Sequence, residues 1–439
     1  MNSIKYINID STVSIETILK YLINGNVFLT GAPGSGKTWI TKQYINYCQA
    51  NYKINTIGIT ASTGVAAKLL NCIIKEQRFF NLAEERCSSG TTIHSWSGID
   101  IVESYDTYEQ VLKRVLSKKF IVDRWRKTHV LIIDEISLLD IKIFMYLDMI
   151  GQHIRNNTKP FGGIRLLVVG DFHQLPPVNG EFCFNDIRWE NIFNHMINLT
   201  TSHRSNDDNL NRILLRIRKG KMLLPNMIKA LKKRNSKKIL ATERYPILVP
   251  LRDMARNINN EKLEENSSTL YKFEAKYNKP ELKSSIQKLS PLEDILHLKI
   301  GCPVIYLIND HSRGLVNGLV GKITNFINEK PVVLFNDIEY IIEKHVWSKK
   351  DLNNKNELSM EQFPLLLAYA ITIHRSQGQT LSQASIVLDG RVWEKSQCYV
   401  ALSRLQNLNG LNLLAFDPKV FEINRPNDTL VKEYYKKWI

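Results

Sequence analysis

The sequence predicts an α/β protein in which two parallel sheets are covered by helices and two smaller parts are inserted. Three observations predict this class. Short, strand-like apolar segments alternate with helical ones, first between residues 27 and 200 and again between 247 and 414. Two of them, 130–133 and 166–169, are almost wholly apolar, as expected of strands buried on both faces. The 439 residues are enough for two or three domains.

The first α/β domain is expected at 1–95 and 128–203. Its predicted strands are 27–30, 54–60, 130–133, 166–169 and 196–200, and a helix over 37–50 follows the first of them. Between 96 and 127 the pattern becomes polar and basic, which predicts an inserted subdomain rather than more of the sheet.

The second α/β domain is expected at 204–295 and 363–439. A basic helical segment over 205–238 precedes a strand at 247–249 and a helix reaching 264, and the polar stretch 266–291 is interpreted as a linker. Residues 301–347 have an all-β pattern, which predicts a small barrel inserted into this domain. Strand-like segments return at 365–370, 386–388 and 411–414.

Charge favours a polyanionic partner. The net charge is +16 and the pI about 9.4, and neutralising phosphates releases condensed counterions, so a salt-dependent affinity for nucleic acid is expected. The alternative is a soluble protein with Lys-rich solvated faces. The six cysteines lack metal-ligand spacing, and no apolar run approaches the roughly 18–20 residues that span a bilayer. A soluble protein of the cytoplasm or nucleus, without membrane contact, is expected.

A phosphate-binding loop lies between the first strand and its helix, the context that its mechanism requires. Its backbone N–H groups would surround the β-phosphate at the helix N-terminus. The lysine would reach the β- and γ-phosphates, and the threonine hydroxyl would bind Mg²⁺. The loop, with the consensus G-x-x-x-x-G-K-[ST], comprises Gly31, Ala32, Pro33, Gly34, Ser35, Gly36, Lys37 and Thr38.

Carboxylates and an amide follow two further strands. Asp134 ends the apolar run 131–133 and is expected to hold Mg²⁺, while Glu135 would activate the attacking water. The alternative is an acidic pair that caps the next helix. Gln174, after 166–169, is the candidate sensor of the γ-phosphate; alternatively it belongs to a loop that the two following prolines fix.

Eight ordered segments resemble the PIF/RecD branch of superfamily 1B DNA helicases, and more closely its PIF-type members. They span nearly the whole chain, and their order carries the resemblance because each alone is a weak signal. The segments are 60–67 (TASTGVAA), 92–99 (TIHSWSGI), 134–137 (DEIS), 170–178 (GDFHQLPPV), 199–204 (LTTSHR), 314–321 (GLVNGLVG), 368–380 (AYAITIHRSQGQT) and 399–404 (YVALSR).

The resemblance implies a fold and an activity. It implies two RecA-like motor domains of the P-loop NTPase class, a wedge subdomain at 96–127 and an SH3-like barrel at 296–362. It also implies an ATP- and Mg²⁺-dependent helicase that translocates 5′ to 3′ on single-stranded DNA and unwinds forked or tailed duplexes in replication, repair or recombination. The protein is expected to be a monomer without DNA.

Site residues follow from the same motifs. Arg204 and Arg404 occupy the family's two arginine positions, and an arginine on the γ-phosphate would stabilise the transition state. Gln377 and Gly378 should face the nucleotide across the cleft. The candidates for DNA contact are Thr63, Gly64, Thr92, His94, Thr372 and His374, together with Trp96 and Phe172 as exposed aromatics that could stack on bases.

Some of these assignments have alternatives. Trp96 could equally pack inside the inserted subdomain, and His94 could be a structural histidine. The chain also departs from the family. Ser14 or a neighbour stands where family members carry a Gln that reads adenine, so strict selection of ATP is not expected. Ser205 and Arg375 replace a common Gln and Lys.

Two other classes of function remain open. A ring-forming P-loop ATPase that remodels or packages nucleic acid would place the arginine finger between subunits and would have one motor domain. A DNA-binding module with a weak motor would bind DNA without stimulated hydrolysis.

Overall fold

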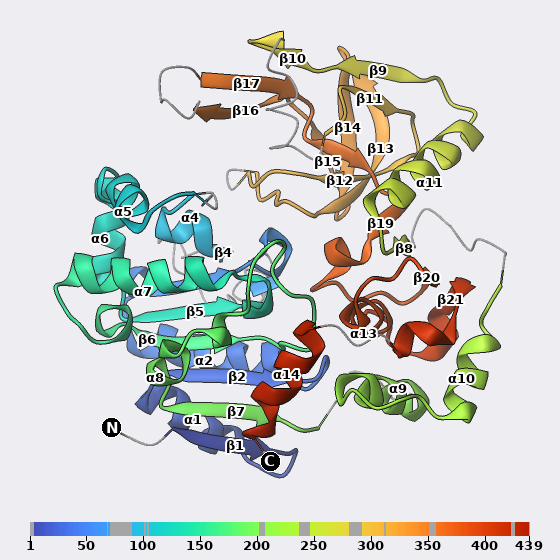
Figure 1. The fold of residues 1–439 in the computed structure, drawn as a ribbon. Coiled ribbons are helices and arrows are strands. Elements are labelled where there is room, and N and C mark those ends of the chain that lie inside the picture. The colour runs from blue at the N-terminus through green and yellow to red at the C-terminus, as the bar shows by residue number, and fades with distance from the viewer. Residues whose placement is uncertain are drawn as a thin grey trace.

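In the computed structural model, three bodies of secondary structure surround a common centre. The structure describes residues 4–67, 69–70, 90–100, 102, 105–201, 207–236, 246–280, 292–310, 313–350, 357–422 and 426–438. Figure 1 shows the first α/β domain at the lower left, the second at the lower right and the β-rich part above them. In the described part of the chain, every helix is too short or too polar to pass through a bilayer.

The first domain contains a seven-stranded sheet in which every pairing is parallel. The strand order is β1-β7-β2-β6-β5-β3-β4. Of the predicted strands, 54–60 differs most from the structure, because residues 54–56 form a 3₁₀ turn. The edge strand β1 was not predicted. The bounds are β1 (Lys5–Ile9), β2 (Val27–Gly31), β3 (Ile57–Ala61), β4 (Thr91–Thr92), β5 (Val130–Asp134), β6 (Arg165–Val169) and β7 (His195–Leu199).

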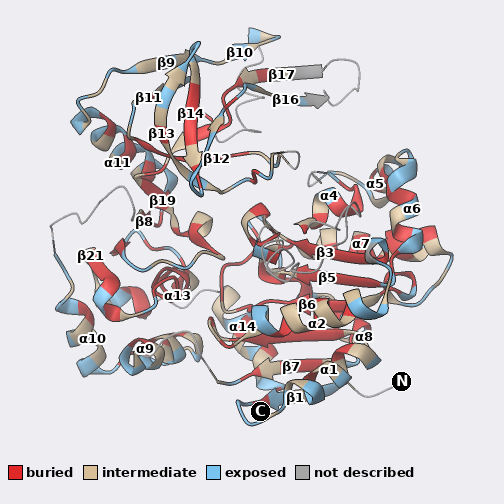
Figure 2. Cartoon of the chain, turned by 180° about the vertical axis from the view of Figure 1, so that it is seen from behind, coloured by how far each residue is buried: buried red, intermediate tan, exposed pale blue. Residues whose placement is uncertain are grey.

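Successive strand residues point to opposite faces, and each face carries its own helices. Val27 and Leu29 of β2 pack with helices α1 (Ile15–Asn24) and α2 (Lys37–Asn51). Phe28, between them, points to the other face and packs with α7 (Ile141–Arg155), among other helices. Both faces of the central strands are therefore buried, as the red strands in Figure 2 show, and this explains why strands such as β5 and β6 are largely apolar.

The inserted stretch 96–127 forms helices rather than an irregular loop. After α4 (Ile93–Ser97) come α5 (Tyr108–Leu116) and α6 (Lys119–Lys127). Val111, Val115 and Trp125 are fully buried in the core that also contains β5 side chains. The basic residues thus lie on the outer faces of two amphipathic helices that cover the first domain.

The second domain contains a four-stranded sheet of order β19-β8-β20-β21, also parallel throughout. Helix α13 is almost entirely buried, which matches its lack of a polar stripe. The strands are β8 (Ile247–Val249), β19 (Ala370–Thr372), β20 (Ala384–Leu388) and β21 (Leu411–Phe416), and the helices are α9 (Asp208–Arg218), α10 (Pro225–Lys232), α11 (Arg252–Glu265) and α13 (Lys395–Ser403).

The β-rich part is larger than the insertion predicted at 296–362. Strands β9 (Tyr271–Glu274) and β10 (Lys276–Tyr277) lie in the stretch interpreted as a linker, and they pair with β11 and β17. Strand β18 (Leu365–Leu367) pairs with β12 of the barrel rather than with the second domain. The remaining strands are β11 (Ile295–Leu298), β12 (Pro303–Tyr306), β13 (Val320–Ile327), β14 (Lys330–Phe335), β15 (Ile338–Ile341), β16 (His345–Lys350) and β17 (Glu357–Gln362).

The last helix, α14 (Pro426–Lys436), returns from the second domain to the first. It lies between the first sheet and α13 in both overall views (Figures 1 and 2). Tyr434 and Trp438 are buried in the core of the first domain, and the Tyr434 hydroxyl lies 3.0 Å from Trp189 Nε1. The chain therefore connects the two α/β domains at its C-terminal helix as well as between β7 and α9.

Candidate functional site

The phosphate-binding loop connects β2 to α2 with glycines in the left-handed region. Gly36, the N-cap of α2, has φ +91°, and a Cβ built there would meet no atom within 4 Å. Glycine is thus required there by backbone conformation and not by crowding. Gly34 also has positive φ, at 79°. Ser35 is buried, and its Oγ has no hydrogen-bond partner among the described residues.

Lys37 is held by the loop that it follows. Its Nζ donates to the carbonyl oxygens of Gly31 at 2.7 Å and Ala32 at 3.0 Å. Burial lowers the pKa of Lys37 to about 8, against the opposing charges of Asp171 and Glu135. A partly buried ammonium beside the N-terminus of a helix is a binding site for an anion such as a phosphate.

Asp134 and Glu135 end β5 and face the same cavity. Burial, followed by the charge of Glu135, raises the pKa of Asp134. Glu135 has a left-handed backbone with φ +54°, and its N–H donates to Asp134 Oδ1 at 2.8 Å. The Glu135 side chain makes no capping hydrogen bond to the following 3₁₀ turn η2 (Ile136–Leu138), so the helix-capping alternative has no support here.

The second domain supplies the opposite wall. Gln377 Nε2 donates to Glu135 Oε2 at 3.2 Å and lies 3.4 Å from Ser137 Oγ, across the domain boundary. Arg404, at the end of α13, is only 3% exposed. Its guanidinium donates to Val400 O at 3.0 Å and to Gln379 O at 3.1 Å. The arginine side chain is thus fixed by its own domain.

One cavity of about 380 Å³ joins these walls. Gln174, from the loop after β6, also faces it, and the Gln174 Oε1 atom has no hydrogen-bond partner among the described residues. Gln377 borders the cavity through its bond to Glu135, whereas Arg204 lies outside the described residues. The lining residues are Pro33, Gly34, Gly36, Lys37, Thr38, Ala66, Leu69, Asp134, Glu135, Gln174, Gly378, Thr380, Arg404 and Gln406.

A divalent cation fits the oxygen atoms on the first-domain wall. Thr38 and Asp134 both line the cavity, and hydroxyl and carboxylate oxygens are ligands that Mg²⁺ accepts. The raised pKa of Asp134 means that burial and the Glu135 charge disfavour its negative charge more than Lys37 and the Glu135 N–H favour it. A cation beside it would favour that negative charge.

The candidates for DNA contact lie at helix starts. The hydroxyls of Thr63 and Thr92 accept from Ala66 N and Ser95 N, each at 3.3 Å. Gly64 begins the helical turn after β3. His94, within α4, is partly buried, and burial lowers its pKa. Thr63, Thr92 and His94 remain partly accessible, whereas Gly64 is buried.

In the second domain, Thr372 is the N-cap of the 3₁₀ turn η6 (Ile373–Ser376). His374 stacks on Trp393, with ring centroids 5.7 Å apart and planes at 14°. Trp393 is 41% exposed and was not predicted from the sequence. An exposed tryptophan beside a candidate DNA-contacting histidine would be recognisable only from this spatial neighbourhood.

The prediction that Trp96 and Phe172 are exposed for base stacking is wrong. Trp96 is 6% exposed and packs edge-to-face on Trp125, so the alternative of packing with the inserted helices is correct. Phe172 is 1% exposed, within an aromatic cluster that includes Phe28, Trp189 and Tyr434. Burying these large rings stabilises the first domain, which leaves no face for a base.

Comparison with known families gives two matches. Residues 10–227 match the model described as PIF1-like helicase, and residues 281–326 match the model for the 2B domain of DNA helicase Pif1. The ATP-dependent DNA helicase PIF1 of Danio rerio is 34% identical over 436 residues, which covers 96% of this chain but only 63% of the relative. The ATP-dependent DNA helicase Pif1 of Bdellovibrio bacteriovorus is 32% identical, covering 94% of this chain and 88% of the relative.

Solved structures agree over the whole chain. The Pif1 helicase from Candida albicans has a TM-score of 0.81 at 29% identity, covering 97% of this chain and 98% of that one. The Bacteroides Pif1 bound to single-stranded DNA has a TM-score of 0.78 at 26% identity, with 96% of both chains covered. The two-domain α/β architecture with its barrel is therefore the RecA-like architecture of these helicases.

Proposed function

The chain belongs to the PIF1-like helicase family, and from that premise we propose that it is an ATP-dependent DNA helicase moving 5′ to 3′ on single-stranded DNA. The observation that carries the proposal is the cavity lined both by Lys37, Asp134 and Glu135 and by Gly378 and Arg404. Because its two walls belong to different domains, a triphosphate held there would pull the domains together, and hydrolysis would release them.

The residues of the two cavity walls have different roles. Lys37 and the phosphate-loop N–H groups bind the β- and γ-phosphates, while Gln174 and Gln377 sense the γ-phosphate. Glu135 takes the proton from the attacking water. Arg404, with Arg204, neutralises charge that develops on the phosphoryl group; such arginines contribute roughly 10³–10⁵ in rate.

Thr38 and Asp134 are the residues that would hold Mg²⁺, which when bound would neutralise charge on the phosphate oxygens. Asp134 is suited to this role because it ends β5 on the wall of the cavity that Thr38 also lines. ATP use is supported by the relatives' names, which describe ATP-dependent DNA helicases.

Single-stranded DNA would cross the faces that carry Thr63, Gly64, Thr92 and His94 in the first domain and Thr372 and His374 in the second. Support comes from their positions at helix starts, where N–H groups and hydroxyls suit phosphates, and from the structure of a similar Pif1 with single-stranded DNA. Forked or tailed duplexes are the substrates unwound, with α5 and α6 in the 96–127 insertion as the wedge. The protein acts inside the cell, in cytoplasm or nucleus, and is a monomer without DNA.

A strand-displacement assay tests this function. Matched duplexes with a 5′ or a 3′ single-stranded tail are mixed with the protein, ATP and Mg²⁺, and strand release is followed over time. The 5′-tailed duplex should be unwound and the 3′-tailed duplex should not. Release from neither duplex, or from the 3′-tailed one only, would refute the proposal.

A further inference from the structure

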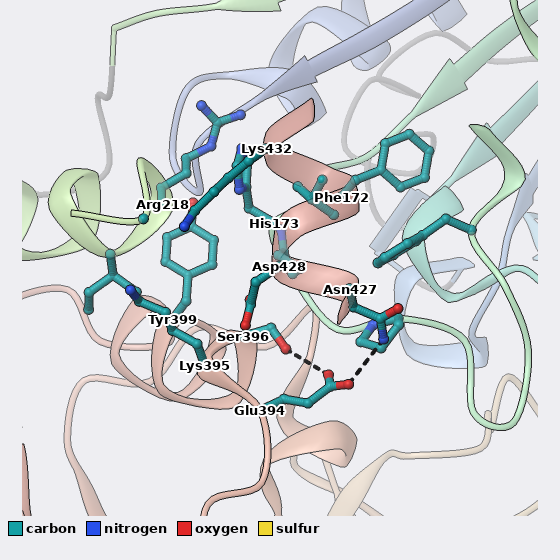
Figure 3. A pocket seen from close by; sticks show the side chains of 16 residues that line it. Phe172, His173, Arg218, Glu394, Lys395, Ser396, Tyr399, Asn427, Asp428 and Lys432 are labelled. Carbon is teal, nitrogen blue, oxygen red and sulfur yellow. Dashed lines mark hydrogen bonds between the residues drawn. The ribbon is translucent and has the colours of Figure 1, made fainter. Parts of the chain in front are cut away.

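A buried carboxylate of the first domain is bound by two elements of the second. Asp171, just after β6, accepts from the Tyr399 hydroxyl at 3.0 Å on Oδ2. Arg218, at the end of α9, forms an ion pair with Asp171, with Nη2 3.3 Å from Oδ1. Figure 3 shows Arg218 and Tyr399 gathered beside α14, next to His173. Two helices of one domain thus converge on one side chain of the other.

The environment of Asp171 requires these partners. Asp171 is fully buried and the Arg218 side chain is 12% exposed. Burial raises the pKa of Asp171, but the charge and hydrogen bond of Arg218, together with neighbouring positive charge, hold it below its usual value. A buried carboxylate without such partners would be strongly destabilising. The contact therefore favours the arrangement in which the second domain lies against Asp171.

An apolar contact reinforces the polar one. Leu175, four residues after Asp171, is fully buried in the core of the second domain with Leu210, Ile213 and Ile217. The turn between them is short, since Gln174 N donates to Asp171 O at 2.9 Å. The segment 171–175 is thus inserted into the second domain at two points, with Gln174 between them facing the cavity.

The first-domain side of this contact is itself fixed. His173 stacks on Tyr435 of α14, with ring centroids 4.6 Å apart, and the Tyr435 hydroxyl lies 2.8 Å from Thr30 Oγ1 in β2. Arg218 lies over the Tyr435 ring at 5.5 Å. Because Thr30 directly precedes the phosphate-binding loop, the network reaches from α9 to the strand that positions Lys37.

Helix α13 carries both the contact and the arginine of the cavity. Tyr399 lies within α13, and Arg404 ends it, with its Nε bonded to Val400 O at 3.0 Å. We propose that Asp171, Arg218 and Tyr399 are positioning residues that dock α13 on the first domain and so aim Arg404 at the phosphates held by Lys37. This inference rests on the proposed ATPase function, which it deepens.

A double-mutant cycle tests the proposal through single-stranded-DNA-stimulated ATP hydrolysis. Tyr399→Phe removes the hydroxyl and keeps the ring, so kcat should fall about tenfold, the effect of losing one hydrogen bond to a charged group. The KM for ATP should change less than about twofold, because Arg404 acts on the transition state. In an Arg404→Ala background, Tyr399→Phe should have almost no further effect on kcat.

Two matched controls separate positioning from general damage. Tyr44→Phe changes a buried tyrosine in the core of the first domain, and it should leave kcat unchanged. Arg218→Lys should lower kcat as Tyr399→Phe does, because lysine loses the guanidinium geometry. Arg188→Lys, which alters a surface Arg–Asp pair of the first domain, should not. Thermal unfolding of each variant reports whether it folds.

The outcomes are distinct. If the wild-type chain hydrolyses no ATP with DNA present, the proposed function fails. If the wild type is active but folded Tyr399→Phe and Arg218→Lys keep kcat within twofold, the positioning proposal alone is overturned. The proposal is also overturned if Tyr399→Phe lowers kcat by the same factor in the wild-type and Arg404→Ala backgrounds. If Tyr399→Phe does not fold, the effect of Arg218→Lys on kcat in the wild-type and Arg404→Ala backgrounds is judged by the same criteria.

Discussion

Glu135 combines a strained backbone with a position on the cavity wall. A non-glycine residue with φ +54° is uncommon and costs about 1 kcal/mol or more, so the surrounding structure must maintain it. Hydrogen bonds on both sides do so, from Glu135 N to Asp134 and from Gln377 to the Glu135 carboxylate. Backbone strain of this kind is concentrated at functional sites, where it sets the direction of a side chain.

We expect Glu135→Gln to bind ATP normally and to hydrolyse it at least about 10²-fold more slowly, because the amide cannot accept the water proton. Single-turnover hydrolysis and equilibrium binding of a fluorescent ATP analogue measure the two steps. Glu181→Gln, at an exposed carboxylate of the same domain, is the control. Hydrolysis by Glu135→Gln within tenfold of wild type would exclude Glu135 as the base.

His173 should make the protein sensitive to acid. Burial, followed by the Arg218 charge, lowers its pKa from 6.5 to about 3. Below pH 6.5 the His173 side chain takes up a proton in the unfolded chain but not in the folded one. The free energy of unfolding therefore decreases as the pH falls from 6.5 toward 3. His173→Gln should reduce the loss of unfolding free energy between pH 7.5 and 5.5 by about 1 kcal/mol. Denaturant unfolding at both pH values measures it; an unchanged difference would contradict the burial of a neutral histidine.

At the residue scale, the sequence predicts groups whose neighbours are close in the chain. Lys37, Asp134 and Glu135 belong to local motifs at strand ends, and the structure brings them to one cavity. Trp96 and Phe172 depend instead on remote partners such as Trp125 and Tyr434. The contact of Arg218 and Tyr399 with Asp171 was not predicted for the same reason, because nothing in their local sequence indicates that they share a carboxylate.

At the scale of elements, residues 309–310 and 313–318 of the β-rich part lie against the first domain. A Cβ on Gly64 would lie 2.7 Å from Asn309 Oδ1, and one on Gly318 would lie 2.3 Å from Val65 Cγ2. Two backbone hydrogen bonds, of 2.8 and 3.0 Å, join Asp310 to Leu315. The motif 314–321 is thus used to bring the barrel against the helical turn that carries the candidate DNA contacts.

We expect Gly318→Ala to weaken binding of single-stranded DNA, because the methyl group would push residues 313–318 away from Val65. Gly314→Ala is the matched control: its φ is +70°, against +93° at Gly318, but no atom lies within 4 Å of its Cβ position. Both substitutions should cost roughly 1–2 kcal/mol of backbone strain. Fluorescence anisotropy with labelled oligonucleotide measures affinity, and equal affinities for the two variants would refute a role for this contact.

Elements were predicted well where periodicity and length were clear, and less well at edges. The buried strands of both α/β sheets appear within a few residues of the predicted ranges. Strands β9 and β10 were missed because no continuous apolar run marks them, although partly exposed residues alternate with exposed ones, which is the period-two pattern of a half-exposed strand. Their pairing with β11 and β17 is a tertiary effect.

At the scale of the whole molecule, the fold brings two α/β domains to one nucleotide cavity and connects them at both ends. The segment between β7 and α9 is one connection, and α14 is the other, with Tyr434 and Trp438 anchored in the first domain. The domains can therefore change their spacing without separating. Such restricted motion suits a motor in which closure on the nucleotide shifts one DNA-contacting face relative to the other.

Mixing two inactive variants tests most directly whether this cavity works within one chain. Lys37→Ala and Arg404→Ala should each lower DNA-stimulated ATP hydrolysis by about 10³-fold or more, and an equimolar mixture should stay at that residual rate because each cavity lacks one essential side chain of its own chain. In a ring whose arginine acts between subunits, the mixture would form some intact sites. Recovery of hydrolysis toward a quarter or half of the wild-type rate, at protein concentrations where the wild type is fully active, would contradict the account.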